Sequence, residues 1–203
     1  MTSIKKIALF GATGNTGQAI LASALKHGLE VTVLVRDPSR LPPDVKVTRV
    51  VQGDVLDADA VKDTVKGQDA VIVALGTRND LSPTTMMSQG LKNIVAAMEE
   101  HGVTRISCIM SSFLFWDRSK IPPQYKEVTN DHERMYDVIK ASKTEWIAAF
   151  PPHIADEPAR GNYVLRCDAP VGKVITKQDL AEIMIKVLSV NDYFGHAIGM
   201  GYP

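Results

Sequence analysis

Hydrophobic residues fall into short continuous runs, separated by longer stretches in which they recur every three or four positions. Short runs rich in Val, Ile and Leu are typical of strands buried on both faces of a parallel sheet. They predict strands at residues 6–10, 30–35, 48–52, 70–75, 106–110 and 145–150. The amphipathic stretches between them predict helices at residues 16–27, 58–66, 85–101 and 130–141.

The order of these elements predicts the fold class. Gly28, Gly67 and Gly102 follow the first three predicted helices, and glycine is the usual residue just past a helix C-terminus. Strands that alternate with helices predict an α/β fold with a doubly wound parallel sheet. In such a sheet, ligands bind in a crevice at the carboxyl ends of the strands.

The alternation stops after residue 150. Pro151 and Pro152 cannot extend a central strand, so we expect an irregular segment up to residue 174, with short strands near Tyr163 and Lys173 at most. Thr176 is the predicted N-cap of a helix that ends at Leu188. The glycine-rich tail, residues 191–203, is expected to pack on the surface or to fray.

Length and composition are those of an ordinary globular chain. The 203 residues are 45% hydrophobic and 23% charged, which predicts a single domain over residues 1–203. We expect residues 1–110 to hold mainly the cofactor part and residues 111–175 mainly the substrate-side loops. Cys108 and Cys167 are far apart and lack metal-ligand spacing, so neither a metal site nor a disulfide framework is expected.

Charge and hydropathy restrict the partners. The 23 Lys and Arg balance 23 Asp and Glu, so no basic field favours nucleic acid or an anionic membrane. No apolar run approaches the ~20 residues of a membrane helix, and the run at residues 7–10 is too short for a signal-peptide core. These features predict a cytoplasmic protein without nucleic-acid or membrane partners.

A glycine motif follows the first predicted strand and opens the first helix. It reads Gly11-Ala12-Thr13-Gly14-Asn15-Thr16-Gly17. Glycines here let the backbone approach a pyrophosphate, which the N–H groups and the positive end of the helix then stabilise. The motif in this context predicts a dinucleotide site. The alternative is that the glycines only make a tight turn between strand and helix.

Basic residues follow the second strand, where an NAD-specific site usually has an acidic residue. Arg36, Ser39 and Arg40 can surround a 2′-phosphate, because a guanidinium group binds phosphate through its planar set of donors. This pattern favours NADPH. Alternatively, Arg36 and Arg40 form a solvated pair with Asp37, or Asp37 binds the ribose of NAD.

The next two strands end at the same edge. Asp54 and Val55 follow the third strand, and Leu75 and Gly76 lie at the end of the fourth. Asp54 can accept a hydrogen bond from the adenine amino group while Val55 covers the ring. Alternatively, Asp54 caps the helix that begins near residue 58.

These residues carry a resemblance to a known family. The chain resembles the atypical short-chain dehydrogenase/reductases that bind NADP, and among them the flavin and biliverdin reductases, over nearly its whole length. The resemblance rests on FGATGNTG (10–17), VTVLVRDPSRLP (31–42), GQDAVIVALGTRNDLSPTT (67–85), NIVAAMEEHGV (93–103), SSFLFWD (111–117) and PPHI (151–154). It implies a monomeric cytosolic enzyme that transfers hydride from NADPH to flavins and to the biliverdin-type tetrapyrroles of haem catabolism.

The resemblance also implies a set of cofactor contacts. It places the pyrophosphate at Gly11, Thr13, Gly14, Asn15 and Thr16, the 2′-phosphate at Arg36, Ser39 and Arg40, and the adenine at Asp54 and Val55. It places Leu75, Gly76 and Arg78 along the ribose and pyrophosphate, and Met87, Ser111, His132, His153 and Ile154 at the nicotinamide.

The tyrosine and lysine of most short-chain dehydrogenases are not found in their usual register. Tyr136 and Lys140 match YxxxK, but the family register places Tyr125 and Thr129 at the two positions, so the lysine is missing. We therefore interpret the YxxxK match as coincidental, with Tyr136 packed on the sheet and Lys140 solvated. Without the dyad, a conjugated acceptor such as a flavin or bilin is favoured, because its rings delocalise the charge.

Two residues are candidates for catalysis. Ser111 follows the fifth strand, and its hydroxyl can donate to the acceptor, or alternatively only cap the loop. His153 follows the sixth strand and can bind the cofactor ribose or supply a proton.

The loop after Ser111 offers an acceptor pocket. We expect Phe113 and Trp116 to cover a flat ring and Lys120 to meet a propionate or phosphate, with at least one aromatic residue of this loop in the core.

Two other functions remain open. The first is an NADP-binding redox sensor without turnover, which has no need of an aromatic pocket. The second is a sugar-nucleotide or isoflavone-type reductase, which needs the dyad or a longer C-terminal substrate region.

Overall fold

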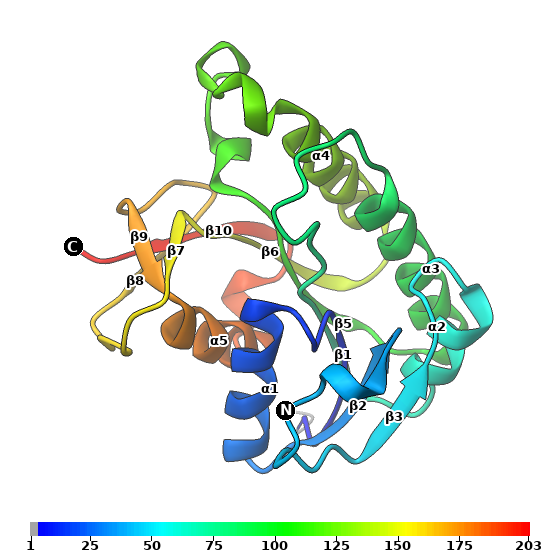
Figure 1. Ribbon diagram of the computed structural model, residues 1–203. Helices are drawn as coiled ribbons and strands as arrows, with labels where there is room; N and C mark the ends of the chain where they lie inside the picture. The colour runs from blue at the N-terminus through cyan, green and yellow to red at the C-terminus, as the bar shows by residue number, and fades with distance from the viewer. Residues whose placement is uncertain (1–3) are drawn as a thin grey trace.

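The computed structural model describes residues 4–203 and contains a sheet of eight strands flanked by helices on both faces (Figure 1). The strand order is β3-β2-β1-β4-β5-β6-β10-β8, and every strand pair is parallel except β10 with β8. The strands are β1 (Lys6–Phe10), β2 (Glu30–Val35), β3 (Arg49–Gln52), β4 (Ala70–Val73), β5 (Arg105–Ile109), β6 (Glu145–Phe150), β8 (Val164–Cys167) and β10 (His196–Gly201). The predicted doubly wound parallel sheet is confirmed.

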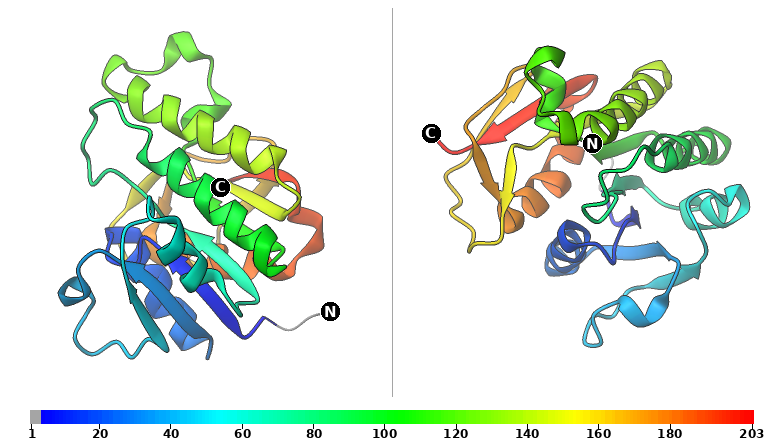
Figure 2. Two further views of the ribbon diagram at one scale, coloured as in Figure 1. Left: turned by 90° about the vertical axis from the view of Figure 1, so that its right-hand side faces the viewer. Right: turned by 45° about the horizontal axis from the view of Figure 1, so that its top comes forward.

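Helices cover the two faces of the sheet in separate groups (Figures 1 and 2). One face carries α1 (Asn15–Lys26) and α5 (Lys177–Lys186), and the other carries α2 (Ala58–Val65), α3 (Met86–His101) and α4 (Lys126–Ala141). The helix α4 begins four residues before its predicted start. A 3-10 turn over Pro123–Tyr125 leads directly into it.

The core is divided by the sheet because successive side chains of a strand point to opposite faces. In β1, Ile7 and Leu9 pack toward α1 and α5, whereas Ala8 and Phe10 pack toward α2 and α3. All four are buried. A strand that is apolar on both faces gives the continuous hydrophobic run from which it was predicted.

The prediction for the C-terminal tail was wrong. Residues His196–Gly201 form β10, which lies between β6 and β8 and is almost completely buried. A Cβ on Gly199 would come 1.9 Å from the carbonyl oxygen of Ala169, and one on Gly201 would come 2.5 Å from that of Val171. The glycines therefore permit a close approach of backbone to backbone, which composition alone does not distinguish from flexibility.

The segment after β6 contains a second, two-stranded parallel sheet. It pairs β7 (His153–Ala155) with β9 (Val174–Thr176). Thr176 then caps α5, as predicted, because its side chain accepts a hydrogen bond from the backbone N–H of Asp179. A 3-10 turn over Val187–Ser189 completes the predicted helical stretch. Other 3-10 turns cover Pro38–Arg40, Ser112–Phe115, Arg118–Lys120 and Asn191–Tyr193.

Within residues 4–203, no helix combines the length and the apolar character that a membrane crossing requires.

Candidate functional site

A cavity of about 540 Å³ opens at the carboxyl ends of the central strands. The strand order reverses between β1 and β4, and the loops after these two strands form much of the cavity wall. Such a switch point is the usual ligand site of a doubly wound sheet. The cavity brings together these predicted residues: Gly11, Thr13, Gly14, Asn15, Thr16, Arg36, Asp54, Val55, Leu75, Gly76, Arg78, Met87, Ser111, Phe113, His132 and Ile154.

The glycine loop leaves the N-terminus of α1 open to the cavity. Gly11 has φ +90°, and a Cβ on it would come 2.2 Å from the carbonyl oxygen of Ala74. A Cβ on Gly17 would come 2.0 Å from the carbonyl oxygen of Gly11. In the described chain no side chain caps α1 and its first turn holds no acidic residue. The loop therefore fits an anionic diphosphate, which the helix N-terminus stabilises.

Arg36 lines the cavity, and its guanidinium group is 4.0 Å from the carboxylate of Asp54. The alternative role of Asp54 as a helix cap is wrong. Asp57 caps α2, accepting from the backbone N–H groups of Asp59 and Ala60, while Asp54 accepts from the N–H of Leu56. Asp54 thus stays at the cavity, where its free oxygen can accept from a ligand.

Ser39 and Arg40 are outside the part of the cavity wall that the described residues form. They lie in the exposed turn over Pro38–Arg40, which Asp37 caps. The hydroxyl of Ser39 donates to Asp37 at 2.7 Å, and this hydrogen bond lowers the pKa of the Asp37 carboxyl. Their contact with a 2′-phosphate requires a ligand that extends beyond this wall or a movement of the turn, and it stays a prediction.

The loop after β4 contributes residues that sequence reasoning missed. Asn79 and Leu81 line the cavity beside the predicted Arg78. Arg78 and Asn79 have φ values of 56° and 67°, an uncommon conformation for residues other than glycine. Such strain persists where the surrounding structure imposes it and clusters at ligand sites. The signal available in the sequence was that Asn79 and Leu81 lie in the loop after the fourth strand.

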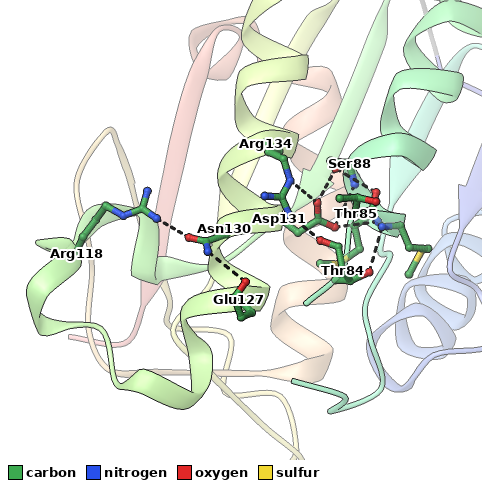
Figure 3. Close-up of polar contacts among 10 residues, drawn as sticks. Thr84, Thr85, Ser88, Arg118, Glu127, Asn130, Asp131 and Arg134 are labelled. Atoms are coloured by element: carbon green, nitrogen blue, oxygen red, sulfur yellow. Dashed lines mark hydrogen bonds and ion pairs between the residues drawn. The ribbon is translucent and has the colours of Figure 1, made fainter. Parts of the chain in front are cut away.

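A buried carboxylate joins the two helices that flank this loop (Figure 3). Asp131 of α4 is fully buried and accepts hydrogen bonds from the backbone N–H of Met87 at 3.0 Å and from the Ser88 hydroxyl at 2.5 Å. Arg134 donates to Asp131 at 3.1 Å and to the carbonyl oxygen of Thr84 at 2.6 Å. Asp131 therefore caps α3 from the neighbouring helix and anchors the end of the cavity loop.

His132 follows Asp131 and lines the cavity. Its Nδ1 is enclosed and has no hydrogen-bond partner among residues 4–203. Burial lowers the pKa of His132 to about 4, although the neighbouring Asp131 charge acts in the opposite direction. The imidazole is therefore neutral near neutral pH. The residue lines the cavity, but its unpaired Nδ1 is closed off from solvent, so a ligand there would meet other atoms of the ring.

The structure agrees with the interpretation that the YxxxK match of Tyr136 and Lys140 is coincidental. Tyr125 and Thr129 line the cavity, whereas Tyr136 is outside the described wall. The Tyr136 ring packs edge-on against Phe150, with centroids 5.2 Å apart. Lys140 lies over this ring and pairs with the exposed Asp137. The cavity therefore has a tyrosine but no lysine at the dyad positions.

An aromatic surface flanks Ser111. Phe113 and Tyr125 both line the cavity, with ring centroids 5.4 Å apart and planes inclined by 31°. Ser111 Oγ accepts from the backbone N–H of Phe113 at 3.2 Å. A hydroxyl that accepts in this way keeps its own hydrogen to donate, so capping the loop and binding a ligand are compatible. Phe115 instead packs on Phe150, as expected of a core residue.

Three further predicted residues are outside the described cavity wall. His153 is exposed in β7, where Ile154 faces the cavity, and neighbouring strand residues point to opposite sides. Trp116 is 47% exposed and reaches the site only through its edge-to-face contact with Phe113. Lys120 lies in an exposed turn beyond it. Their roles stay predictions, and each requires a ligand that extends beyond the cavity or a moved loop.

Comparison with known proteins identifies the class of site. A family model described as NAD(P)H-binding matches residues 11–191, so the chain belongs to this NAD(P)H-binding family. The matched range runs from the glycine loop through α5, and the loop and open helix end fit the diphosphate of such a cofactor.

Curated relatives match over part of their length. The chain is 34% identical to reductase pytE of Aspergillus terreus in an alignment of 121 positions that covers 46% of each protein. It is 33% identical to an undecaprenol-linked N-acetylglucosaminyl 4-epimerase of Escherichia coli O157:H7 in an alignment of 105 positions that covers 49% of this chain and 30% of the relative. The matches thus span less than half of these relatives.

Solved structures share the fold over nearly the whole chain. A putative epimerase from Bacteroides thetaiotaomicron is 26% identical, with a TM-score of 0.84 and 98% of both chains covered. An anaerobillin reductase from Escherichia coli O157:H7 is 16% identical, with a TM-score of 0.82 and 98% of both covered. A short-chain dehydrogenase/reductase from Veillonella parvula in complex with NADP is 16% identical, with a TM-score of 0.79, covering 99% of this chain and 96% of that one.

Proposed function

We propose that this protein is an NADPH-dependent reductase of flat conjugated acceptors, namely flavins and biliverdin-type tetrapyrroles. The observation that carries the proposal is the composition of the cavity. Its wall combines an open helix N-terminus and Arg36 with the paired rings of Phe113 and Tyr125. A nucleotide and a flat ring are the ligands that these two groups of residues bind.

The missing lysine favours this acceptor class. Ketone reduction needs a proton donor at the developing alkoxide. In the dyad that supplies this proton, a lysine follows the tyrosine by four residues, and this chain has Thr129 at the lysine position. When bound, NADPH supplies a hydride, and a conjugated acceptor delocalises the charge it receives and takes its proton from water. The main task of the protein is then to position the acceptor, which the two rings, the Ser111 hydroxyl and the neutral His132 can do.

Arg36 supports NADPH over NADH. Its guanidinium group is 66% exposed at the cavity, and Asp54, at 4.0 Å, neutralises only part of its charge. A 2′-phosphate would gain charge-assisted hydrogen bonds there. The short-chain dehydrogenase/reductase from Veillonella parvula, whose structure is a complex with NADP, shares this fold, which is consistent with the proposal.

The test is a titration of the protein with NADPH, followed by nicotinamide fluorescence, and then addition of FMN or, in parallel, biliverdin. We expect saturable binding followed by catalytic loss of NADPH with both acceptors. Binding without NADPH loss would contradict a reductase and would favour an NADP-binding regulator.

Variants in the aromatic surface test the acceptor site. Phe113→Ala and Tyr125→Ala should each raise the KM for FMN about three- to tenfold, because a stacked ring pair loses its attraction. The matched control is Tyr136→Phe. This tyrosine of α4 packs against Phe150 of the sheet and lies outside the described cavity wall. The substitution should leave turnover unchanged, and a collapse of hydride transfer in this folded variant would show that Tyr136 belongs to the site.

A further inference from the structure

Lys177 lies beside the glycine loop, although 162 residues separate it from Asn15. It is the first residue of α5, which packs next to α1 on one face of the sheet (Figure 1). Its side chain is 15% exposed. Its Nζ donates to Oδ1 of Asn15 at 2.9 Å and is 2.7 Å from Oδ1 of Asp156. Asn15 lines the cavity and opens α1, so Lys177 supports the cavity wall from behind.

The chemistry of the contact determines how Asn15 is oriented. An ammonium group has three donors and no acceptor, so only the amide oxygen of Asn15 can face it. The amide nitrogen, which carries two donors, is therefore turned away from Lys177. A flipped amide would place donors against donors, so the contact favours one of the two amide orientations.

We propose that Lys177 is a positioning residue of the dinucleotide site. By binding Oδ1 of Asn15, it commits the amide NH₂ of Asn15 to an oxygen of the cofactor diphosphate. The inference rests on a cofactor in this cavity and not on the identity of the acceptor. It assigns a task in cofactor binding to α5, which lies outside the glycine motif.

The charge of Lys177 is balanced by Asp156. Its ammonium group is mostly enclosed and lies 2.7 Å from Oδ1 of Asp156, so the two charges largely cancel. Lys177 therefore acts on a diphosphate mainly through the amide of Asn15.

The first experiment measures NADP⁺ affinity by calorimetry, which needs no turnover. Lys177→Met should weaken NADP⁺ binding about tenfold, as expected for the loss of one hydrogen bond to a charged group. Lys177→Arg should restore most of the affinity, because a guanidinium group also donates to the Asn15 oxygen. The matched control is Lys186→Met, which removes a lysine paired with Glu182 at the other end of α5 and should change affinity less than twofold.

Two further measurements separate positioning from general structural support. The first is the affinity for 2′-AMP, which has the 2′-phosphate but no diphosphate, and Lys177→Met should leave it unchanged. The second is the double variant with Asn15→Ala, which should bind NADP⁺ no more weakly than Asn15→Ala alone, since Lys177 acts through Asn15.

Equal losses for NADP⁺ and 2′-AMP, or additive losses in the double variant, would overturn the assignment. Failure of the unaltered protein to bind NADP⁺ would overturn the cofactor placement as well. If the variants change NADP⁺ affinity as expected but the protein reduces no acceptor, the result would support the role of Lys177 and contradict only the proposed reductase.

Discussion

At the scale of single residues, His132 combines burial with an unpaired ring nitrogen. The residue lines the cavity, whereas its Nδ1 is closed off from solvent and has no partner in the described chain. Burial lowers the pKa of the imidazole to about 4. A neutral imidazole has one donor and one acceptor nitrogen, so His132 can orient a ligand without adding charge to the site.

The lowered pKa predicts a pH dependence of stability. The unfolded chain binds a proton at His132 near pH ~6.5, but the folded chain does so only near pH 4, so stability falls as pH drops through this window. His132→Leu removes this proton uptake. Between about pH 7 and about pH 5, we expect the free energy of unfolding of the variant to fall by about 1 to 2 kcal/mol less than that of the unaltered protein.

Urea denaturation at the two pH values measures this difference. Parallel changes in both proteins would contradict the buried, neutral state of His132.

Arg36 predicts the coenzyme preference. Arg36→Ala should weaken NADPH binding about ten- to a hundredfold, because the 2′-phosphate loses charge-assisted hydrogen bonds, and should change NADH binding little. Arg40→Ala is the informative comparison, since Arg40 lies in the exposed turn outside the described cavity wall. If the turn closes on the cofactor, the double variant loses more affinity than Arg36→Ala alone. Equal losses for NADPH and NADH would contradict the 2′-phosphate assignment.

At the scale of elements, α3 obtains its cap from α4. The side chain of Thr85, its own N-cap residue, makes no capping hydrogen bond, and the Asp131 carboxylate binds the N–H of Met87 instead. A charged acceptor at a helix N-terminus is favoured by the helix dipole as well as by its hydrogen bonds. This cap keeps Met87 of α3 and His132 of α4 on one cavity wall.

Asp131→Asn should therefore lower the free energy of unfolding by about 2 to 4 kcal/mol, since it removes a buried charge that Arg134 and Ser88 bind. Asp137→Asn on the same helix is the control. Its carboxylate is 67% exposed and pairs with Lys140, so we expect a change of about 0.5 kcal/mol or less. Similar losses in both variants in urea denaturation would contradict the capping role.

At the scale of the whole molecule, the chain completes its sheet with its last strand. The strand β10 is inserted between β6 and β8 and brings Ile198 and Met200 into the core that α1 and α5 cover. Tyr202 extends this closure, because its hydroxyl donates to Asp179 of α5 at 2.5 Å. The C-terminal segment thus joins the sheet to the helix that carries Lys177.

Deletion of residues 196–203 should prevent cooperative folding, because it leaves β6 with an unpaired edge and exposes the apolar surface that β10 covers. Thermal unfolding followed by circular dichroism should show no sharp transition. Deletion of Pro203 alone, which is exposed, should leave the transition unchanged. A cooperative transition in the longer deletion would show that the other strands form an independent unit.

Local patterns account for what could be predicted. The first six strands, the glycine loop and the Thr176 cap are each signalled by residues a few positions apart, and the structure has them within a few residues of the prediction. Most predicted cofactor residues also line one cavity, because parallel strands end at the same edge. His153 lies outside the described wall because its position depends on which face of β7 turns inward, and β7 was not predicted.

The amino-acid sequence by itself determined the alternation of strands and helices, the glycine loop and the NAD(P)H-binding family, since these depend on periodicity and on backbone requirements along the chain. Only the tertiary structure decided that the glycine-rich tail forms a strand inside the sheet, that Asp131 caps another helix and that Lys177 binds Asn15. Each of these joins residues that are distant in sequence. Their partners are set by how the layers pack, which no local pattern records.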